Sequence, residues 1–184
     1  SRPIDTLEFA ELNEHTTAPQ QIEALVRPLL EGRSAGVISE AGVPAVADPG
    51  AAVVALCHRK GIRVVPLVGP SSIILAMMAS GQNGQSFALN GYLPVKEPDR
   101  SRAVKRLEAR ALSEHQSQAF IETPYRNVKL FGELLQCCAA DTVLTVAADI
   151  TAPTELIATH TVAEWRRIGV PDIHKRPAIF IIGK

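Results

Sequence analysis

The sequence predicts an α/β fold in two domains, residues 1–86 and 87–184. Short apolar runs alternate with helical segments from residue 33 onward, and this alternation is typical of βαβ units in a parallel sheet. The polar run GQNGQS at 81–86 separates two such series and marks a boundary between domains. A chain of 184 residues with 46% hydrophobic residues is long enough to bury a core in each domain.

The first domain is predicted to be mainly a parallel sheet. AGVISE at 35–40 and IRVVPLV at 62–68 are short apolar runs of the kind expected for buried strands. Each is followed by a loop and then by a segment with helical spacing, at 51–61 and 73–81, and a further helix is predicted at 19–32. So small a sheet leaves its edges exposed, so we expect it either to pair with another chain or to be preceded by further sequence.

The second domain is predicted to contain a mixed sheet, because five strand candidates stand against about three helices. We expect the charged helix in this domain to present a solvated face. The strands are expected at 87–94, 118–122, 142–149, 155–161 and 176–183, and two of the helices at about 97–114 and 127–138.

Composition limits the classes of partner. Nineteen basic and nineteen acidic side chains cancel, so a nucleic-acid partner has to be argued from local patches. Cys57, Cys137 and Cys138 are too few and too badly spaced for a disulfide framework or a zinc site, which fits a reducing cytoplasm. No apolar run approaches the ~18 residues of a membrane span. We expect a soluble cytoplasmic protein with no metal site.

The loop SEAGVPAVADPG at 39–50 has the composition of a ligand-binding loop. In open α/β sheets ligands bind outside the carboxyl ends of strands, and Gly42 and Gly50 let backbone approach a ligand closely. Asp48–Pro49 resembles a helix cap followed by proline at the first helical position, and capping alone explains it equally well. Glu40, at the end of a predicted strand, is either exposed at the mouth of a cleft or bound to a ligand.

The loop VGPSS at 68–72 is the second candidate. Gly69 would form the turn, and Ser71 or Ser72 would start a helix whose first amides point outward. Capping is again an equal explanation. Neither loop has the Gly-Lys-Ser/Thr of a phosphate-binding loop or the G-x-G-x-x-G pattern, and no G-x-S-x-G occurs, so phosphoryl transfer and hydrolysis are disfavoured.

Polar residues also follow two predicted strands of the second domain. Glu122, Tyr125 and Arg126 come after QAFIE, and Asp149 comes after TVLTVA. A carboxylate, a phenol and an arginine in one turn can bind a polar substrate or move a proton. The alternative is a surface ion pair between Glu122 and Arg126 at helical spacing.

Several of these stretches, in this order and spacing, resemble the tetrapyrrole-methylase superfamily of methyltransferases that use S-adenosyl-L-methionine. Within it, the sequence is similar to the RsmI-type branch, which methylates a cytidine ribose 2′-hydroxyl in small-subunit ribosomal RNA. The resemblance depends on GVISEAGVPAVADPG (36–50), GIRVVPLVGPSS (61–72) and FALNGYLP (87–94). It continues more weakly through FIETPYRN (120–127) and VAADITAPTE (146–155).

The resemblance implies a cofactor cleft between two α/β domains and, usually, a homodimer. It implies a wall of cofactor contacts at Glu40, Ala41, Gly42 and Pro44 and a second wall at Gly69, Pro70, Ser71 and Ser72. It also implies that Tyr125, Ile150 and Pro177 close over the adenosyl group.

Two departures from the family pattern are visible. Family members open with a glycine-rich strand and loop of the type G-T-P-I-G-N-L and an acidic E-D-T-R-like segment, whereas this sequence starts at SRPIDTLEFAELNEHT. We therefore expect a truncated or divergent first domain. The last strand is preceded by HKRPA rather than by the Lys-Gly-Glu-Met-like run of the RNA-methylating branch.

Methyl transfer to a ribose hydroxyl depends on in-line positioning and on removal of the hydroxyl proton. Glu122 and Asp149 are the candidate bases, and Arg126 is the candidate contact for a phosphate or ribose oxygen. The implied substrate is ribosomal RNA in the small subunit, with no membrane or DNA partner, although 4% aromatic residues give little support for base stacking.

Basic side chains that could line an RNA groove are Arg100, Arg102, Lys105, Arg106 and Arg110, and then Arg166, Arg167, Lys175 and Arg176. Two alternatives stay open. One is carbon methylation of a tetrapyrrole, and the other is a non-catalytic, dimerising remnant of the fold.

Overall fold

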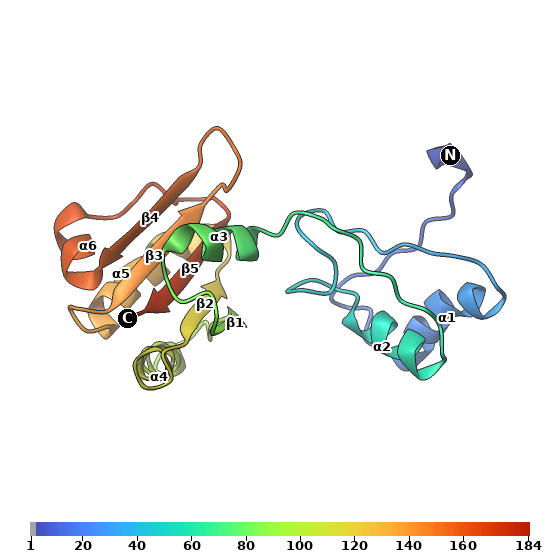
Figure 1. Cartoon of the computed structure of the whole chain (residues 1–184), viewed down its shortest axis with the longest axis horizontal. Coiled ribbons are helices and arrows are strands. Elements are labelled where there is room, and N and C mark those ends of the chain that lie inside the picture. The colour runs from blue at the N-terminus through green and yellow to red at the C-terminus, as the bar shows by residue number, and fades with distance from the viewer. Residues whose placement is uncertain (1–2) are drawn as a thin grey trace. The chain divides into compact units, whose positions relative to one another are not determined.

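The computed structural model describes residues 3–184. Its contacts divide the chain into two compact units, Ser1–Pro70 and Ser71–Lys184, which are described separately (Figure 1). By its contacts, the segment 71–86, which the sequence assigns to the first domain, lies in the second unit. No helix among the residues described is long and apolar enough to cross a membrane.

The second unit contains a five-stranded mixed sheet, as predicted. Its strand order is β1-β2-β5-β3-β4. β1 pairs with β2 in parallel, whereas β5 runs antiparallel to both of its neighbours, β2 and β3. The strands are β1 (Phe87–Tyr92), β2 (Ser117–Ile121), β3 (Val143–Ala148), β4 (Leu156–Thr161) and β5 (Ala178–Gly183).

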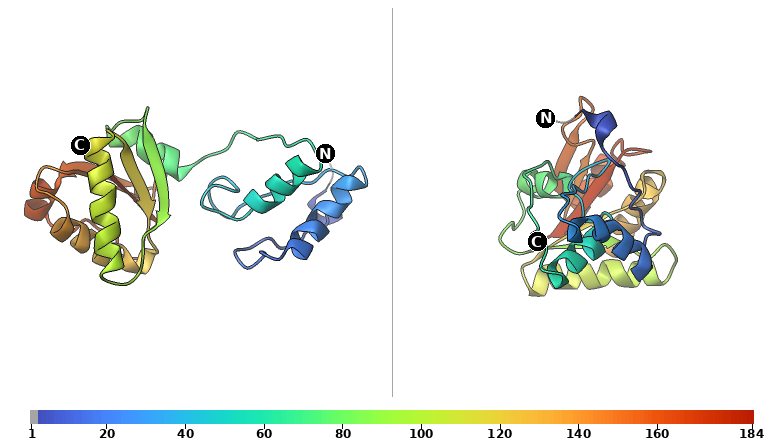
Figure 2. Two further views of the ribbon diagram at one scale, coloured as in Figure 1. Left: turned by 90° about the horizontal axis from the view of Figure 1, so that it is seen from below. Right: turned by 90° about the vertical axis from the view of Figure 1, so that its right-hand side faces the viewer.

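Helices cover both faces of this sheet. On one face α4 (Asp99–Ser113), α5 (Asn127–Cys137) and α6 (Val162–Ile168) bury the larger core, which includes Phe120 and Phe180. On the other face α3 (Ser72–Ser80) packs on Ala119, Ile179 and Ile181. These residues are sequence neighbours of Phe120 and Phe180, and successive side chains of a strand point to opposite faces of the sheet. Figure 2 shows this unit from below, with α4 in yellow-green against the sheet.

The predicted start of α3 is confirmed. The Ser71 hydroxyl accepts a hydrogen bond from the Ile74 amide at 3.5 Å, and Gly81 ends the helix in the left-handed region with φ 71°. Ser71 therefore has a capping role.

The first unit is built from helices. α1 (Pro19–Leu30) and α2 (Ala51–Arg59) pack together and bury Ile22, Val26 and Leu56, and a short 3₁₀ turn spans Ile4–Thr6. Both helices lie where the sequence predicts them. Gly50 rather than Asp48 is the residue before α2, so the predicted Asp48–Pro49 cap is wrong.

The predicted parallel sheet of the first unit is wrong for the residues described here. Residues 35–39 and 62–70 have no strand partner, and the side chains of Ile38, Leu67 and Val68 are largely exposed. The physical reason is that a strand needs a second backbone to complete its hydrogen bonds, and within residues 3–70 none pairs with these segments. The apolar residues of these two segments are suitable for strands, but no strand forms because neither segment has a pairing partner among the described residues.

Replacement of Gly183 by alanine is expected to destabilise the second unit. A Cβ at Gly183 would lie 2.8 Å from the Gln82 side-chain carbon Cδ, and that side chain is fixed because its amide donates to the Thr145 hydroxyl at 2.8 Å and the Ile181 carbonyl at 3.1 Å. We expect a loss of about 1–3 kcal/mol in the free energy of unfolding.

The matched control is Gly132→Ala in α5, where no heavy atom lies within 4 Å of the added Cβ. It should raise the free energy of unfolding by about 0.5–1 kcal/mol because glycine disfavours a helix interior. Urea denaturation followed by the fluorescence of Trp165, the chain's single tryptophan, measures both variants. Equal stability of the two variants would contradict the assigned role of Gly183.

Candidate functional site

The sheet topology brings several loops to one edge. β2 and β3 both run antiparallel to β5, so their carboxyl ends point the same way and meet the start of β5. Backbone hydrogen bonds connect the loops there: the Asp149 amide donates to the Pro177 carbonyl and the Lys175 amide to the Pro124 carbonyl, both at 3.1 Å. The predicted residues Tyr125, Arg126, Asp149, Ile150 and Pro177 all lie in these loops.

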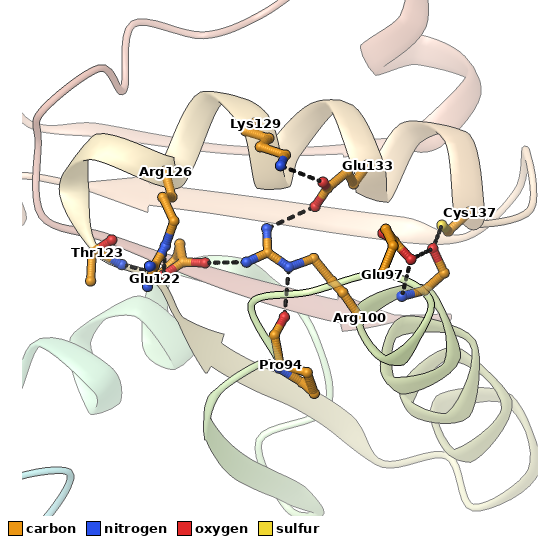
Figure 3. Close-up of polar contacts among 10 residues, drawn as sticks. Pro94, Glu97, Arg100, Glu122, Thr123, Arg126, Lys129, Glu133 and Cys137 are labelled. Carbon is orange, nitrogen blue, oxygen red and sulfur yellow. Dashed lines mark hydrogen bonds and ion pairs between the residues drawn. The ribbon is translucent and has the colours of Figure 1, made fainter.

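Glu122, at the end of β2, is the centre of a buried ion cluster (Figure 3). Its side chain is 1% exposed. Its Oε1 accepts from the Thr123 amide at 2.7 Å and from Nε and Nη2 of Arg126 at 3.0 and 2.7 Å. Its Oε2 accepts from Arg100 Nη2 at 3.0 Å. Both carboxylate oxygens are therefore occupied.

These contacts keep Glu122 ionised. Burial opposes ionisation, but the hydrogen bonds from Arg126 and Thr123 and the charges of Arg126 and Arg100 outweigh it and lower the pKa of the carboxyl. A carboxylate with a lowered pKa and two occupied oxygens accepts a further proton poorly. Glu122 is covered and Arg126 is partly exposed, so this is not the surface ion pair that was the alternative from the sequence. The role of Glu122 as a general base stays a prediction.

Arg126 lies in the turn Pro124–Arg126 and is partly exposed, with 37% of its side-chain surface accessible. The hydrogen bond to Glu122 raises the pKa of Arg126, and the nearby Tyr92 contributes in the same direction. Nη1 has no hydrogen-bond partner within residues 3–184, so the guanidinium can bind a further acceptor.

Asp149 follows β3 and is fixed in a second ion pair. Its Oδ2 accepts from the Thr154 hydroxyl and from Arg176 Nε, both at 2.7 Å. The hydrogen bond from Thr154 and then that from Arg176 lower the pKa of this carboxyl. Its Oδ1 has no partner in the part of the chain that is described, so one oxygen can still accept a hydrogen bond.

Three of the six non-glycine residues with positive φ in residues 3–184 lie in these loops, and the others are Ala45, Ala47 and His115. Asp149, Thr151 and Lys175 have positive φ values of 49°, 72° and 60°, in the region that favours glycine. Such conformations cost free energy and cluster at functional sites.

Two tyrosines, the only two in the chain, are exposed at this edge. Tyr92 ends β1, opposite Ile121 of β2, and Tyr125 precedes Arg126. The Lys175 ammonium lies 5.8 Å from the centre of the Tyr125 ring. This aromatic and cationic surface is not predicted from the sequence, because the two tyrosines are far apart along the chain.

The predicted cofactor residues Glu40, Ala41, Gly42 and Pro44, with Gly69 and Pro70, lie in the first unit. A Cβ built on Gly69 would be 3.9 Å from Val43 Cγ1, so the two predicted loops approach each other. A Cβ on Gly42, whose φ is 75°, meets no heavy atom within 4 Å. Open backbone at these glycines fits a ligand that contacts main-chain atoms.

The prediction of a solvated face is wrong for Arg100. The charged helix was expected to present a solvated face, yet the Arg100 side chain is 1% exposed. Helical spacing predicts this burial, because Arg100 lies on the same face of α4 as the buried residues Ala103, Val104, Leu107 and Ala111.

The chain shares its fold with a solved methyltransferase. The solved structure of the methyltransferase CobJ matches with a TM-score of 0.60 and 19% identity over 90% of this chain and 70% of that one, which shows the shared fold. No family model matches the sequence.

Curated relatives are more specific. Ribosomal RNA small subunit methyltransferase I of Vibrio cholerae serotype O1 is 35% identical over 161 residues, 88% of this chain and 54% of the relative. The protein of the same name in Escherichia coli O157:H7 is 33% identical over 75% of this chain and 47% of the relative. The predicted resemblance is confirmed: the chain is a relative of these methyltransferases, and it spans about half of their length.

The lowered pKa of Asp149 predicts acid-sensitive stability. A carboxyl whose pKa is lower in the folded than in the unfolded state stabilises the fold above its unfolded pKa, about 4, and this contribution is lost as the pH falls through the folded value. Between pH 6 and pH 2.5 the free energy of unfolding should therefore fall less steeply in Asp149→Asn than in the unmodified chain.

Urea denaturation at a series of pH values measures this slope. Asp141→Asn is the control, because Asp141 is an exposed aspartate before β3, at the other end of that strand. It should follow the unmodified chain at every pH. A slope for Asp149→Asn equal to that of the control would contradict the pairing of Asp149 with Thr154 and Arg176.

Proposed function

We propose that the chain forms part of an S-adenosyl-L-methionine-dependent methyltransferase that modifies a cytidine ribose 2′-hydroxyl in small-subunit ribosomal RNA. The main support is the exposed edge with Tyr92, Tyr125, Arg126 and Lys175 in a chain related to enzymes named as ribosomal RNA methyltransferases. Cations bind phosphates and tyrosines stack on bases, so this edge matches the chemistry of RNA.

The proposed cofactor supplies a methyl group on a sulfonium sulfur. The residues proposed to contact it in the first unit are Glu40, Ala41, Gly42, Pro44, Gly69 and Pro70, and those in the second are Ser71, Ser72, Tyr125, Ile150 and Pro177. The open backbone at Gly42 supports a cofactor held through main-chain contacts.

Asp149 is the better candidate for the residue that receives the hydroxyl proton. The bound cofactor would supply a methyl group to the ribose oxygen and would keep the electron pair of the broken carbon–sulfur bond, so the hydroxyl proton would have to pass to a group of the protein. Asp149 Oδ1 is available for it, whereas both oxygens of Glu122 are occupied. In this proposal Glu122 orients Arg126, and Arg126 binds an RNA phosphate.

The role of Asp149 gives a kinetic prediction. Asp149→Asn should lower kcat about 100-fold or more with little change in KM, because loss of a general base removes an interaction of the transition state. Single-turnover methylation of small ribosomal subunits, with cofactor binding measured in parallel by calorimetry, tests it. Unchanged kcat with unchanged cofactor binding would exclude Asp149 as the base.

Two alternatives from the sequence remain to be distinguished. Carbon methylation of a tetrapyrrole is compatible with the fold shared with CobJ, but it calls for a broad apolar trough, and this edge carries the exposed Lys175 and the partly exposed Arg126. A non-catalytic, dimerising remnant would bind no cofactor. The homodimer itself is a prediction that sedimentation measures.

The methyl acceptor is tested by offering the two candidate substrates in parallel. Cofactor carrying a labelled methyl group is incubated with the chain and either small ribosomal subunits from cells that lack the modification or uroporphyrinogen III. We expect label in the RNA and, after nuclease digestion, in 2′-O-methylcytidine. Label in the tetrapyrrole would support the first alternative, and no cofactor binding at all would support the second.

A further inference from the structure

Arg100 connects three separate elements of the second unit. Its Nε donates to the Pro94 carbonyl at 2.7 Å, its Nη1 to Glu133 Oε2 at 2.9 Å and its Nη2 to Glu122 Oε2 at 3.0 Å. These acceptors lie after β1, on α5 and at the end of β2. Figure 3 shows the guanidinium between them, so its position is set from three directions.

Stability alone does not require an arginine at this position. Burial of a charge is costly, and well-packed apolar residues often replace buried ion pairs without loss of stability. The rest of the buried stripe of α4 is apolar, namely Ala103, Val104, Leu107 and Ala111. An arginine in such a stripe therefore points to a task that an apolar side chain cannot perform.

That task is visible at Glu122. Arg100 occupies Oε2, which leaves Oε1 as the acceptor for Arg126. Arg126 then binds Oε1 through Nε and Nη2 together, at 3.0 and 2.7 Å, which fixes the plane of its guanidinium. The Glu133 carboxylate, 3.8 Å from the Lys129 ammonium through its other oxygen, holds Arg100 from the opposite side.

We propose that Arg100 is a positioning residue which, through Glu122, holds the guanidinium of Arg126 ready to bind a phosphate of the RNA substrate. Arg100 cannot contact RNA itself, since its side chain is buried. The inference rests on the proposed function, because it takes an RNA phosphate as the ligand of Arg126.

A double-mutant cycle tests the connection. Arg126→Gln should raise KM for small ribosomal subunits about tenfold and reduce the salt dependence of RNA binding by about one phosphate contact. Arg100→Met should raise KM about threefold or more, with kcat changed less than twofold. The double variant should be no worse than Arg126→Gln alone, because both changes remove the same phosphate contact.

Two further variants separate positioning from folding. Arg100→Lys retains the charge but not the planar three-way contact, so it should restore KM only in part. Arg59→Met is the control, since Arg59 is an exposed arginine at the end of α2 with no side-chain hydrogen bond or ion pair among the described residues, and it should leave KM unchanged. If Arg100→Met does not fold, the cycle is run with Arg100→Lys.

The outcomes also separate this inference from the proposed function. Additive effects of the Arg100 and Arg126 variants on KM, or no effect of either Arg100 variant, would show Arg100 to be structural only. If Arg126→Gln leaves KM unchanged, the phosphate contact is wrong. The positioning role is then tested separately by NMR of a ¹⁵N-arginine-labelled chain. The Arg126 Nε proton should exchange with solvent slowly in the unmodified chain and at least tenfold faster in Arg100→Lys, and equal exchange rates would contradict the positioning role.

Discussion

The candidate site depends on the direction of β5. This strand lies between β2 and β3 and runs antiparallel to both, so its first residues meet their last ones at a single edge. Arg176 thereby reaches Asp149, and the amide of Lys175 reaches the carbonyl of Pro124. If β5 ran in parallel, the loop before it would lie at the opposite edge and these ion pairs and hydrogen bonds could not form. The burial of every residue of β5 makes this arrangement costly to disturb.

The same edge illustrates how acidic residues can be ionised without being bases. Glu122 and Asp149 each have an arginine partner and a lowered pKa, so both are charged at neutral pH. The difference lies in the acceptor atoms: Glu122 uses both oxygens on protein donors, and Asp149 uses one. Hydrogen-bond geometry is therefore the reason for proposing different roles for Glu122 and Asp149, because charge and pKa direction do not distinguish them.

The sequence predicted the second unit well and the first unit in part. In residues 71–184 strand periodicity identified all five strands because each has a partner and a buried face. The runs at 35–40 and 62–68 have equally suitable residues, but pairing depends on a second backbone, which the periodicity of one segment cannot report. The charge of Arg100 predicts a solvated side chain, whereas its place on the apolar stripe of α4 predicts a buried one, and the structure agrees with the stripe. The tyrosine surface cannot be predicted without the register of β1 with β2, which places Tyr92 opposite Ile121.

The neutral net charge of the chain is compatible with a local site for phosphate. Near β2 the acids Glu122 and Glu133 are turned inward by Arg100, while Arg126 and Lys175 keep part of their surface accessible. Near β3 and β4 the balance is reversed, because Glu155 and Asp172 are exposed and Arg176 is largely covered. The edge is therefore polarised along its length, cationic beside Tyr125 and acidic beyond Asp149. A polyanion would be attracted to the accessible charges of Arg126 and Lys175, and this attraction requires no excess of basic residues in the chain.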